Sequence, residues 1–282
     1  MTTPEWNNSH NYGQGSEQGY GYQNQNPNPG APYGQPGYAG AGPQAGFQPG
    51  TVYAPTPPDA PGAVGQGFKG YFQNFGPWFG AAVVYLVLQF VPMIPFTFVI
   101  ALSGILEAEG TASPGPIGAT AAFISLLLLG ACVFLVGLWM YANFYHGAVE
   151  EANGQRVSFR GLFRFDGGRV GTMVTLAAYG ILVWLGCLLF IIPGLIIAFL
   201  LCWVAVIKAE DPSKGIGEAM AESYRLSTQN IGTTLLLVVL LVLLQLAASL
   251  IPIVGSLVVL PVLYFAWVLA YRCLTRRPAA RW

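Results

Sequence analysis

Residues Thr233–Ile251 read TTLLLVVLLVLLQLAASLI, and this stretch without a charged side chain indicates the fold class of the whole chain. A helix needs about 20 mostly apolar residues to cross the hydrocarbon core of a bilayer. The twelve leucines and valines between Leu235 and Leu250 together favour insertion by roughly 4–7 kcal/mol, at about 0.3–0.6 kcal/mol each. The stretch therefore predicts a transmembrane helix.

The composition of the remaining chain agrees with this prediction. Of the 282 residues, 54% are hydrophobic and only 9% are charged, whereas soluble domains carry about 25% charged residues. The mean hydropathy is +0.53. Lys and Arg number 12 and Asp and Glu number 12, so the net charge favours neither nucleic acid nor an acidic substrate as a partner. These values exclude an ordinary soluble globular protein.

The chain contains six apolar stretches, which are Trp78–Leu106, Ala119–Tyr145, Thr172–Ile192, Gly194–Ile207, Thr233–Ile251 and Ile253–Tyr271. Pro92 and Pro95 predict a kink in the first stretch. The third ends at Pro193–Gly194, a turn dipeptide, and the fourth is short. The predicted fold is an all-α, polytopic transmembrane helical bundle of about six spans.

The basic residues test this count independently, because all of them fall on one side when the connections are numbered through six spans. The connection Glu107–Gly118 on the other side holds two acids and no base. The positive-inside rule then places both termini in the cytoplasm, with the chain in the cytoplasmic membrane. The basic residues are Lys69, Arg156, Arg160, Arg164, Arg169, Lys208, Lys214, Arg225, Arg272, Arg276, Arg277 and Arg281.

Three regions follow from the composition. Residues 1–68 lack Lys, Arg, Leu and Ile and are rich in Gly, Pro, Gln, Asn and Tyr, so we expect a disordered cytoplasmic tail. Its spaced tyrosines could contact other membrane or cytoplasmic proteins weakly and multivalently, or the tail could be solvated without a partner. Residues 69–275 form the six-helix transmembrane domain, and residues 276–282 form a short basic cytoplasmic end.

Few polar side chains lie inside the predicted spans, and no Asp, Glu, Lys or Arg lies deep in one. Gln89 and Gln245 are candidates for hydrogen bonds between helices, and the alternative is that they line a polar path. The four cysteines have no CxxC spacing and are expected to pack, and His10 and His146 are far apart, so we expect no metal site. No cofactor is expected.

The first predicted cytoplasmic loop, VSFRGLFRFDGGR, carries a periodic pattern. Arg156, Arg160 and Arg164 recur every four residues, and Phe159 and Phe163 recur with the same step. On a helix this spacing places a basic strip beside an aromatic strip, which is typical of a segment lying among anionic headgroups. The alternative is a plain basic loop that only follows the topology rule.

The second loop, KAEDPSKGIGEAMAESYRLSTQN, predicts a short amphipathic helix. We expect Ser213 to cap it, and Ile216, Met220 and Tyr224 to form its apolar face up to about Ser227. Glu218 and Glu222 then share an exposed face. They could act as an acid pair, but a solvated face is favoured because no nucleophile accompanies them.

The sequence lacks the short motifs that carry common enzyme chemistry. It contains no P-loop, HExxH, GxSxG or dinucleotide GxGxxG motif. The run Asp166-Gly167-Gly168-Arg169 is similar to a fragment of phosphatidyl-transferase motifs but lacks their further metal-binding aspartates. We therefore predict no catalytic site.

The stretch from Ile191 to Asn230 resembles the membrane domain attached to some bacterial glycerophosphodiester phosphodiesterases. There an IPG turn opens a helix, and a second helix carries a spaced motif that here comprises Ala219, Ser223, Tyr224, Leu226, Ser227 and Asn230. Pro261 and Tyr271-Arg272 are similar to the family's final span. The hydrolase domain is absent, so the resemblance implies the fold and no activity. The N-terminal tail resembles those of actinobacterial membrane proteins.

Together these features predict a non-catalytic interaction or accessory component of membrane or envelope organisation. Its expected partners are anionic lipid headgroups and other proteins, and no nucleic acid. The alternative function is a channel or facilitator for a small or lipidic solute, in which the polar glutamines Gln89 and Gln245 line a path through the bundle.

Overall fold

A computed structural model describes residues 53–55, 60–108, 116–251 and 253–280. The chain divides into two units, Met1–Ala45 and Gly46–Trp282, and all described residues lie in the second. Most of the tail predicted from composition therefore lies outside the described residues.

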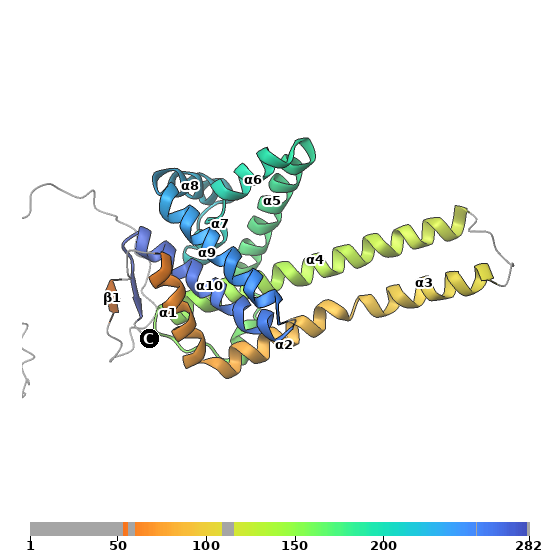
Figure 1. Cartoon of the computed structure of the whole chain (residues 1–282), viewed down its shortest axis with the longest axis horizontal. Coiled ribbons are helices and arrows are strands. Elements are labelled where there is room, and N and C mark those ends of the chain that lie inside the picture. Colours follow the sequence, from red (N-terminus) through yellow and green to blue (C-terminus); the bar gives the residue numbers. More distant parts are fainter. Residues whose placement is uncertain (1–52, 56–59, 109–115, 252, 281–282) are drawn as a thin grey trace, which may run out of the picture. The chain divides into compact units, whose positions relative to one another are not determined.

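The described chain is almost entirely helical, which confirms the predicted all-α class (Figure 1). The helices are α1 (Ala60–Gln73), α2 (Phe75–Phe90), α3 (Met93–Ala108), α4 (Pro116–Ala152), α5 (Gly167–Leu189), α6 (Ile191–Leu200), α7 (Val204–Glu210), α8 (Ile216–Gln229), α9 (Ile231–Ser249) and α10 (Val254–Leu274). A short 3-10 turn, η1 (Phe159–Phe163), precedes α5. Two strands, β1 (Tyr53–Pro55) and β2 (Pro278–Ala280), pair antiparallel with Tyr53 opposite Ala280.

Six segments are long and apolar enough to cross a membrane, as the sequence predicts. Their bounds shift from the predicted ones by several residues, and the first span is interrupted at Val91–Pro92, between α2 and α3, as its prolines predict. The segments are Phe75–Val99, Phe123–Ala152, Gly167–Leu189, Ile191–Glu210, Ile231–Ser249 and Leu257–Leu274.

The boundary placed at residue 68 is wrong, because residues 60–68 belong to α1, which packs against α10. Apart from Tyr71, the buried face of α1 is made of small residues that lack the hydrophobic signal of a usual core helix. At Gly67 an added Cβ would lie 3.2 Å from the Val262 carbonyl oxygen, so the two backbones meet without side chains between them. In the short basic C-terminal segment, Ala279 and Ala280 of β2 are buried.

An aromatic cluster forms the core near the C-terminal end of α4. The Trp78 ring lies 4.8 Å from that of Phe265, and the Phe144 ring packs edge-on against Trp78 and Tyr85. These residues come from α2, α4 and α10, so the cluster joins three spans that are distant in sequence. It fixes the helix ends on which the charged residues lie.

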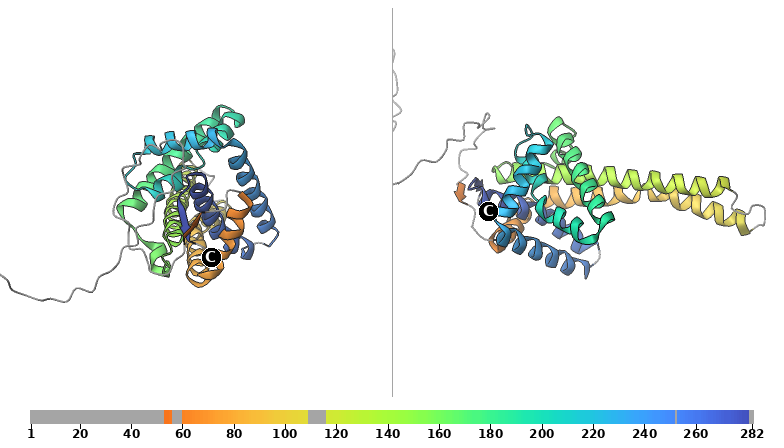
Figure 2. Two further views of the ribbon diagram at one scale, coloured as in Figure 1. Left: turned by 90° about the vertical axis from the view of Figure 1, so that its left-hand side faces the viewer. Right: turned by 90° about the horizontal axis from the view of Figure 1, so that it is seen from above.

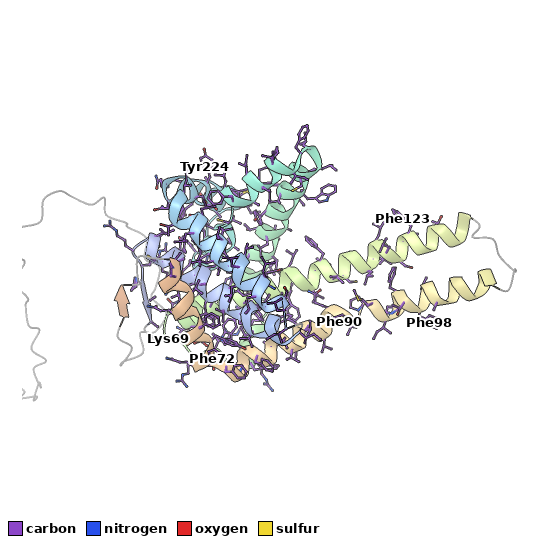
Figure 3. The ribbon with its side chains drawn as sticks, viewed as in Figure 1. Lys69, Phe72, Phe90, Phe98, Phe123 and Tyr224 are labelled. Carbon is purple, nitrogen blue, oxygen red and sulfur yellow. The ribbon has the colours of Figure 1, made fainter. Side chains whose placement is uncertain are left out.

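The other ends of the helices present apolar side chains outward. Figure 1 and the right view of Figure 2 show α3 and the first half of α4 running side by side beyond the tips of the neighbouring helices. Phe98 and Phe123 are 68% and 61% exposed there, and Figure 3 shows both side chains pointing away from the two helices. In a polytopic membrane protein, such surfaces are suited to acyl chains.

Candidate functional site: a buried ionic layer

Charged side chains gather where the C-terminal ends of α4, α7 and α10 meet the N-terminal end of α5. Arg169, Lys208 and Arg272 are buried there together with Glu151. We call this set, with the residues paired to it, the ionic layer. It lies at the ends of the spans to which the sequence assigned all basic residues.

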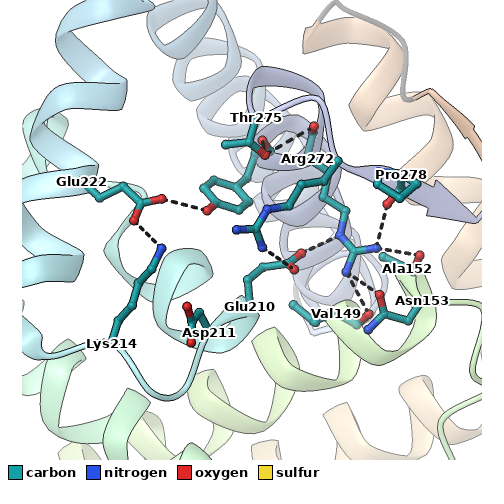
Figure 4. Close-up of polar contacts among 12 residues, drawn as sticks. Val149, Ala152, Asn153, Glu210, Asp211, Lys214, Glu222, Arg272, Thr275 and Pro278 are labelled. Carbon is teal, nitrogen blue, oxygen red and sulfur yellow. Dashed lines mark hydrogen bonds and ion pairs between the residues drawn. The ribbon is translucent and has the colours of Figure 1, made fainter. Parts of the chain in front are cut away.

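Arg272 on α10 is the centre of the ionic layer (Figure 4). Its Nε donates to Oε1 of Glu210 at 2.5 Å, and only 3% of the Arg272 side chain is exposed. A guanidinium has five N–H donors. Beyond Glu210, this group donates to four oxygens, which are the carbonyl oxygens of Val149, Ala152 and Pro278 and the Oδ1 of Asn153. One side chain therefore joins α10 to α4, α7 and β2 and caps the C-terminal carbonyls of α4.

A chain of contacts leads outward from Glu210. Its second oxygen pairs with Arg277 at 3.4 Å, and the Arg277 guanidinium lies 5.5 Å from the centre of the Tyr271 ring. The Tyr271 hydroxyl donates to Glu222 Oε1 at 3.0 Å, and the other Glu222 oxygen pairs with Lys214. The surface helix α8 is thereby tied to the end of α10.

Lys208 closes the connection between α7 and α8. Its buried ammonium group donates to the carbonyl oxygens of Pro212, at 2.8 Å, and of Lys214. Carbonyl oxygens satisfy a buried cation without a carboxylate partner. The result is a fixed loop between two helices.

Arg169 binds the start of α5 to the end of α4. Its guanidinium pairs with Asp166 and with Glu150 Oε1, the latter at 3.0 Å. Asp166 also accepts the Arg169 backbone N–H at 2.9 Å and thus caps α5. Partial burial acts to raise the pKa of Asp166, but the hydrogen bonds and charge of Arg169 outweigh it and hold that pKa below its ordinary value. The Asp-Gly-Gly-Arg run is a helix cap with an internal ion pair.

Glu151, near the end of α4, similarly ties α4 to the start of α2. Its Oε1 accepts hydrogen bonds from Asn74 Nδ2, from the Trp78 indole at 3.3 Å and from the Val157 backbone N–H at 3.1 Å. Two donors belong to the start of α2 and the third to the loop that follows α4. The carboxylate therefore fixes the entry of the first span and the loop that follows α4.

The amphipathic helix expected around Arg156, Arg160 and Arg164 is not present, because the segment is extended except for the five-residue η1 turn. Leu162 is fully buried, so the loop is anchored to the protein core. Arg164 lies 3.7 Å from Glu150, and all three arginines are exposed.

The two phenylalanines of this segment also depart from the expected aromatic strip. The Phe163 ring stacks on Tyr85 at 4.8 Å and contacts Trp139, so it belongs to the core. Phe159 lies close to Gly80 of α2 and is 42% exposed. Lipid contact by Arg156, Phe159, Arg160 and Arg164 stays a prediction, whereas Phe163 is turned toward the protein.

The helix of the second loop exists as α8, but three details of the prediction are wrong. Ser213 bonds to Asp211, whose pKa its hydroxyl lowers, and α8 begins after Gly215, whose N–H the Glu218 carboxylate accepts at 2.9 Å. The buried face consists of Ala219, Ser223 and Ser227; of the predicted apolar residues, Met220 is partly buried against the core, while Ile216 and Tyr224 are exposed. Glu222 is ion-paired and half-buried, so it does not share a solvated face with Glu218.

Gln89 and Gln245 lie on different helices with different surroundings. The Gln89 amide nitrogen packs 3.5 Å from the position of an added Cβ at Gly137 of α4. Gln245 of α9 has a buried Oε1 without a hydrogen-bond partner among the described residues. Inter-helical hydrogen bonding by the Gln245 oxygen is therefore not observed.

The cysteines and His146 are placed differently from expectation. Cys132 and Cys187 are exposed, and Cys202 and Cys273 are half-buried, although Cys187 also packs closely against Gly194 of α6. His146 is buried, and its Nε2 lies 3.0 Å from the Thr172 hydroxyl on α5. Within the described ranges, no group of three or more His, Cys, Asp or Glu is arranged to hold a metal ion.

Sequence reasoning treated the basic residues as markers of topology and missed their buried pairing. Arg272 and Glu210 are 62 positions apart, and Arg272 and Asn153 are 119 apart, so no local spacing connects them. The one available signal was that each of these charges directly follows or precedes an apolar span.

No family model, no curated protein and no solved structure matches this chain.

Proposed function

We propose that this multi-pass membrane protein is a non-catalytic accessory component that assembles with other membrane proteins. One observation carries the proposal: every acidic side chain that the structure describes accepts a hydrogen bond or forms an ion pair within the protein. Carboxylates held in this way link helices, cap them or fix loops, which supports a structural role for these side chains. The residues are Glu150, Glu151, Asp166, Glu210, Asp211, Glu218 and Glu222.

The exposed charge at the ionic layer supports an orientation and a lipid partner. The exposed basic residues outnumber the exposed acids Asp166 and Glu218, and they are Lys69, Arg156, Arg160, Arg164, Arg225 and Arg276. Anionic headgroups attract such a surface by about 1 kcal/mol per charge. We infer that this end faces the cytoplasm, in the cytoplasmic membrane, with both termini inside.

Reporter fusions test the orientation. A reporter active only in the cytoplasm should function at either terminus, and one active only outside should function in the Glu107–Gly118 connection. The opposite pattern would reverse the topology.

Two measurements test the accessory role. A photo-crosslinking residue at Leu127, which is 57% exposed on α4, should form discrete adducts with other membrane proteins in cells. The same residue at buried Phe144 serves as the control and should form none. Proteoliposomes with purified protein should release entrapped solutes no faster than empty liposomes. Absent adducts at Leu127 together with rapid solute release would refute the role.

The partnerless oxygen of Gln245 favours a second function, a facilitator for a small or lipidic solute. A buried amide oxygen inside a span is costly unless a polar group reaches it, and a passing solute could supply that group. Solute flux that is lost in Gln245→Leu but retained in Gln89→Leu would support this function over the accessory role. The resemblance to the phosphodiesterase membrane domain is compatible with either one.

A further inference from the structure

Helix α6 is too short to cross a bilayer. It comprises 10 residues and therefore spans about 15 Å at 1.5 Å per residue, against roughly 30 Å of hydrocarbon. The apolar segment Ile191–Glu210 reaches membrane length only when α7 is added. A turn at Leu201–Trp203 separates the two helices, and Val204–Ala209 of α7 are all buried inside the protein.

The end of α6 is fastened to α8. The Ser223 hydroxyl donates to the Leu200 carbonyl at 3.2 Å and accepts the Trp203 backbone N–H, and the Ser227 hydroxyl donates to the Phe199 carbonyl. The opposite side of α8 exposes polar groups that include Glu218, Arg225 and Gln229. Such a helix lies outside the hydrocarbon. The length of α6 then limits how far its other end can reach from the surface of the membrane.

That other end is an apex without polar side chains. From Gly186 to Ala198 the sequence is GCLLFIIPGLIIA, and Phe190 and Ile192 are 73% and 70% exposed. Part of the backbone of the turn is satisfied, and only Phe190 separates α5 from α6. Its N–H donates to Gly186, its carbonyl accepts from Gly194, and Pro193 has no N–H. A turn in hydrocarbon requires few unpaired backbone groups.

The two helices of this hairpin support each other. An added Cβ at Gly186 would lie 2.9 Å from the Gly194 Cα, so the backbones touch near the apex. Nearer the base, the Tyr179 hydroxyl donates to the Ala198 carbonyl at 3.3 Å. Close packing through small residues and one hydrogen bond is how helices associate in lipid.

We propose that α5 and α6 form a half-membrane hairpin whose exposed apolar surface binds the acyl chains of one leaflet only. It enters from the side of the ionic layer and ends near the centre of the bilayer. The 23-residue α5 fits this depth because it is inclined away from α4 (Figure 1). Because the α5–α6 hairpin replaces two predicted crossings, the number of crossings stays even, and both termini remain on the same side of the membrane. The inference does not depend on the accessory function.

Depth measurement of the apex tests the proposal in the full-length protein. A bimane probe on Ile192→Cys, in a chain whose four native cysteines are replaced, is reconstituted into vesicles that carry spin-labelled lipids. Quenching should be strongest with a label near the end of the acyl chain and weak with a headgroup label. The matched probe on Ala221→Cys of α8 should show the reverse. Strongest quenching of the Ile192 probe by the headgroup label would overturn the hairpin, whichever surface it marks.

A second variant needs no cysteine replacement. Ile192→Lys places a charge at the apex, and Leu250→Lys places one at the 82% exposed end of α9, which follows α8 directly and at 19 residues is long enough to reach the far surface. Ile192→Lys should reduce the protein recovered in membranes, while Leu250→Lys should leave it unchanged. Equal recovery of both variants would show that the α5–α6 apex reaches water and would contradict the proposal.

Discussion

The Nε of Arg272 lies 2.5 Å from Oε1 of Glu210, with both side chains almost completely buried at the meeting point of α7 and α10. The remaining donors of Arg272 reach the end of α4 and the strand β2. A single cation thus connects four segments of the described chain. Such a pair stabilises its surroundings mainly while both partners are present, because either charge left alone stays buried and loses its closest partner.

Arg272→Met should destabilise the protein by about 3–5 kcal/mol, because it leaves the Glu210 carboxylate buried and removes the cap of α4. Thermal unfolding in detergent measures the effect. Arg276→Met, which removes an exposed charge nearby, serves as the control and should change little. The double variant Arg272→Met/Glu210→Met should recover part of the loss. Equal unfolding temperatures for the two single variants would contradict the importance of the pair.

Tyr71→Phe should stabilise the protein, because the Tyr71 hydroxyl on α1 is buried without a hydrogen-bond partner in the described part of the chain. Burial raises the pKa of Tyr71 from 10.0 to about 12. Between these values the unfolded state releases the phenol proton while the folded state retains it, so stability falls as pH rises. The variant should reduce this alkaline sensitivity, as followed by unfolding temperature against pH. Tyr224→Phe, at an exposed position, should leave the pH dependence of stability unchanged. A similar change in both variants would argue against the buried Tyr71 hydroxyl as its source.

Gly194→Ala should destabilise the α5–α6 hairpin by about 1–3 kcal/mol through overpacking. The added Cβ would lie only 2.1 Å from the Cys187 sulfur and 2.6 Å from the Cys187 backbone nitrogen, so a side-chain rotation alone cannot relieve the clash. Gly180→Ala on α5 meets nothing within 4 Å and should be neutral or stabilising by about 0.5–1 kcal/mol. Proteolysis and thermal unfolding in detergent compare the two. Indistinguishable variants would mean that the hairpin is more loosely packed than these distances require.

The pair Arg156→Gln/Arg160→Gln should reduce binding of anionic lipids without releasing the protein from the membrane. Each exposed arginine near an anionic leaflet contributes about 1 kcal/mol, and salt weakens the effect. Native mass spectrometry of protein extracted from mixed-lipid nanodiscs counts the retained lipids. Arg225→Gln/Arg276→Gln removes the same charge elsewhere and should change lipid retention less. The reverse order would show that the loop after α4 is not the lipid contact.

Part of the fold followed directly from composition. The stretch Leu235–Leu250 predicts a span because its leucines and valines favour hydrocarbon whatever the neighbouring helices do. The break at Val91–Pro92 also follows from local chemistry, since Pro92 removes a backbone donor. Helix α1 could not be predicted in this way, because its buried face is glycine and alanine apart from Tyr71 and its stability comes from contact with α10.

In the loop after α4, by contrast, the sequence predicted a helix that the structure does not contain. The four-residue repeats of Arg and Phe predicted a surface helix. In the structure, the Tyr85 ring stacks on the Phe163 ring, and the Tyr85 hydroxyl donates to the Leu162 carbonyl at 2.8 Å. Tertiary contacts to α2 override a weak local preference for helix. Similarly, Glu222 appeared solvated from its position on α8, but Tyr271 and Lys214 lie beside it in the folded chain.

The sequence by itself determined the all-helical class, the number of apolar segments and the collection of basic residues at one end. These properties depend on the transfer free energy of each segment, which is a sum over its own residues. Only the tertiary structure decided which charges are buried, which face of α8 is packed and where α6 ends. Those outcomes depend on pairs such as Arg272–Glu210 and Ser223–Leu200, whose members lie far apart in sequence and meet only after the helices have packed.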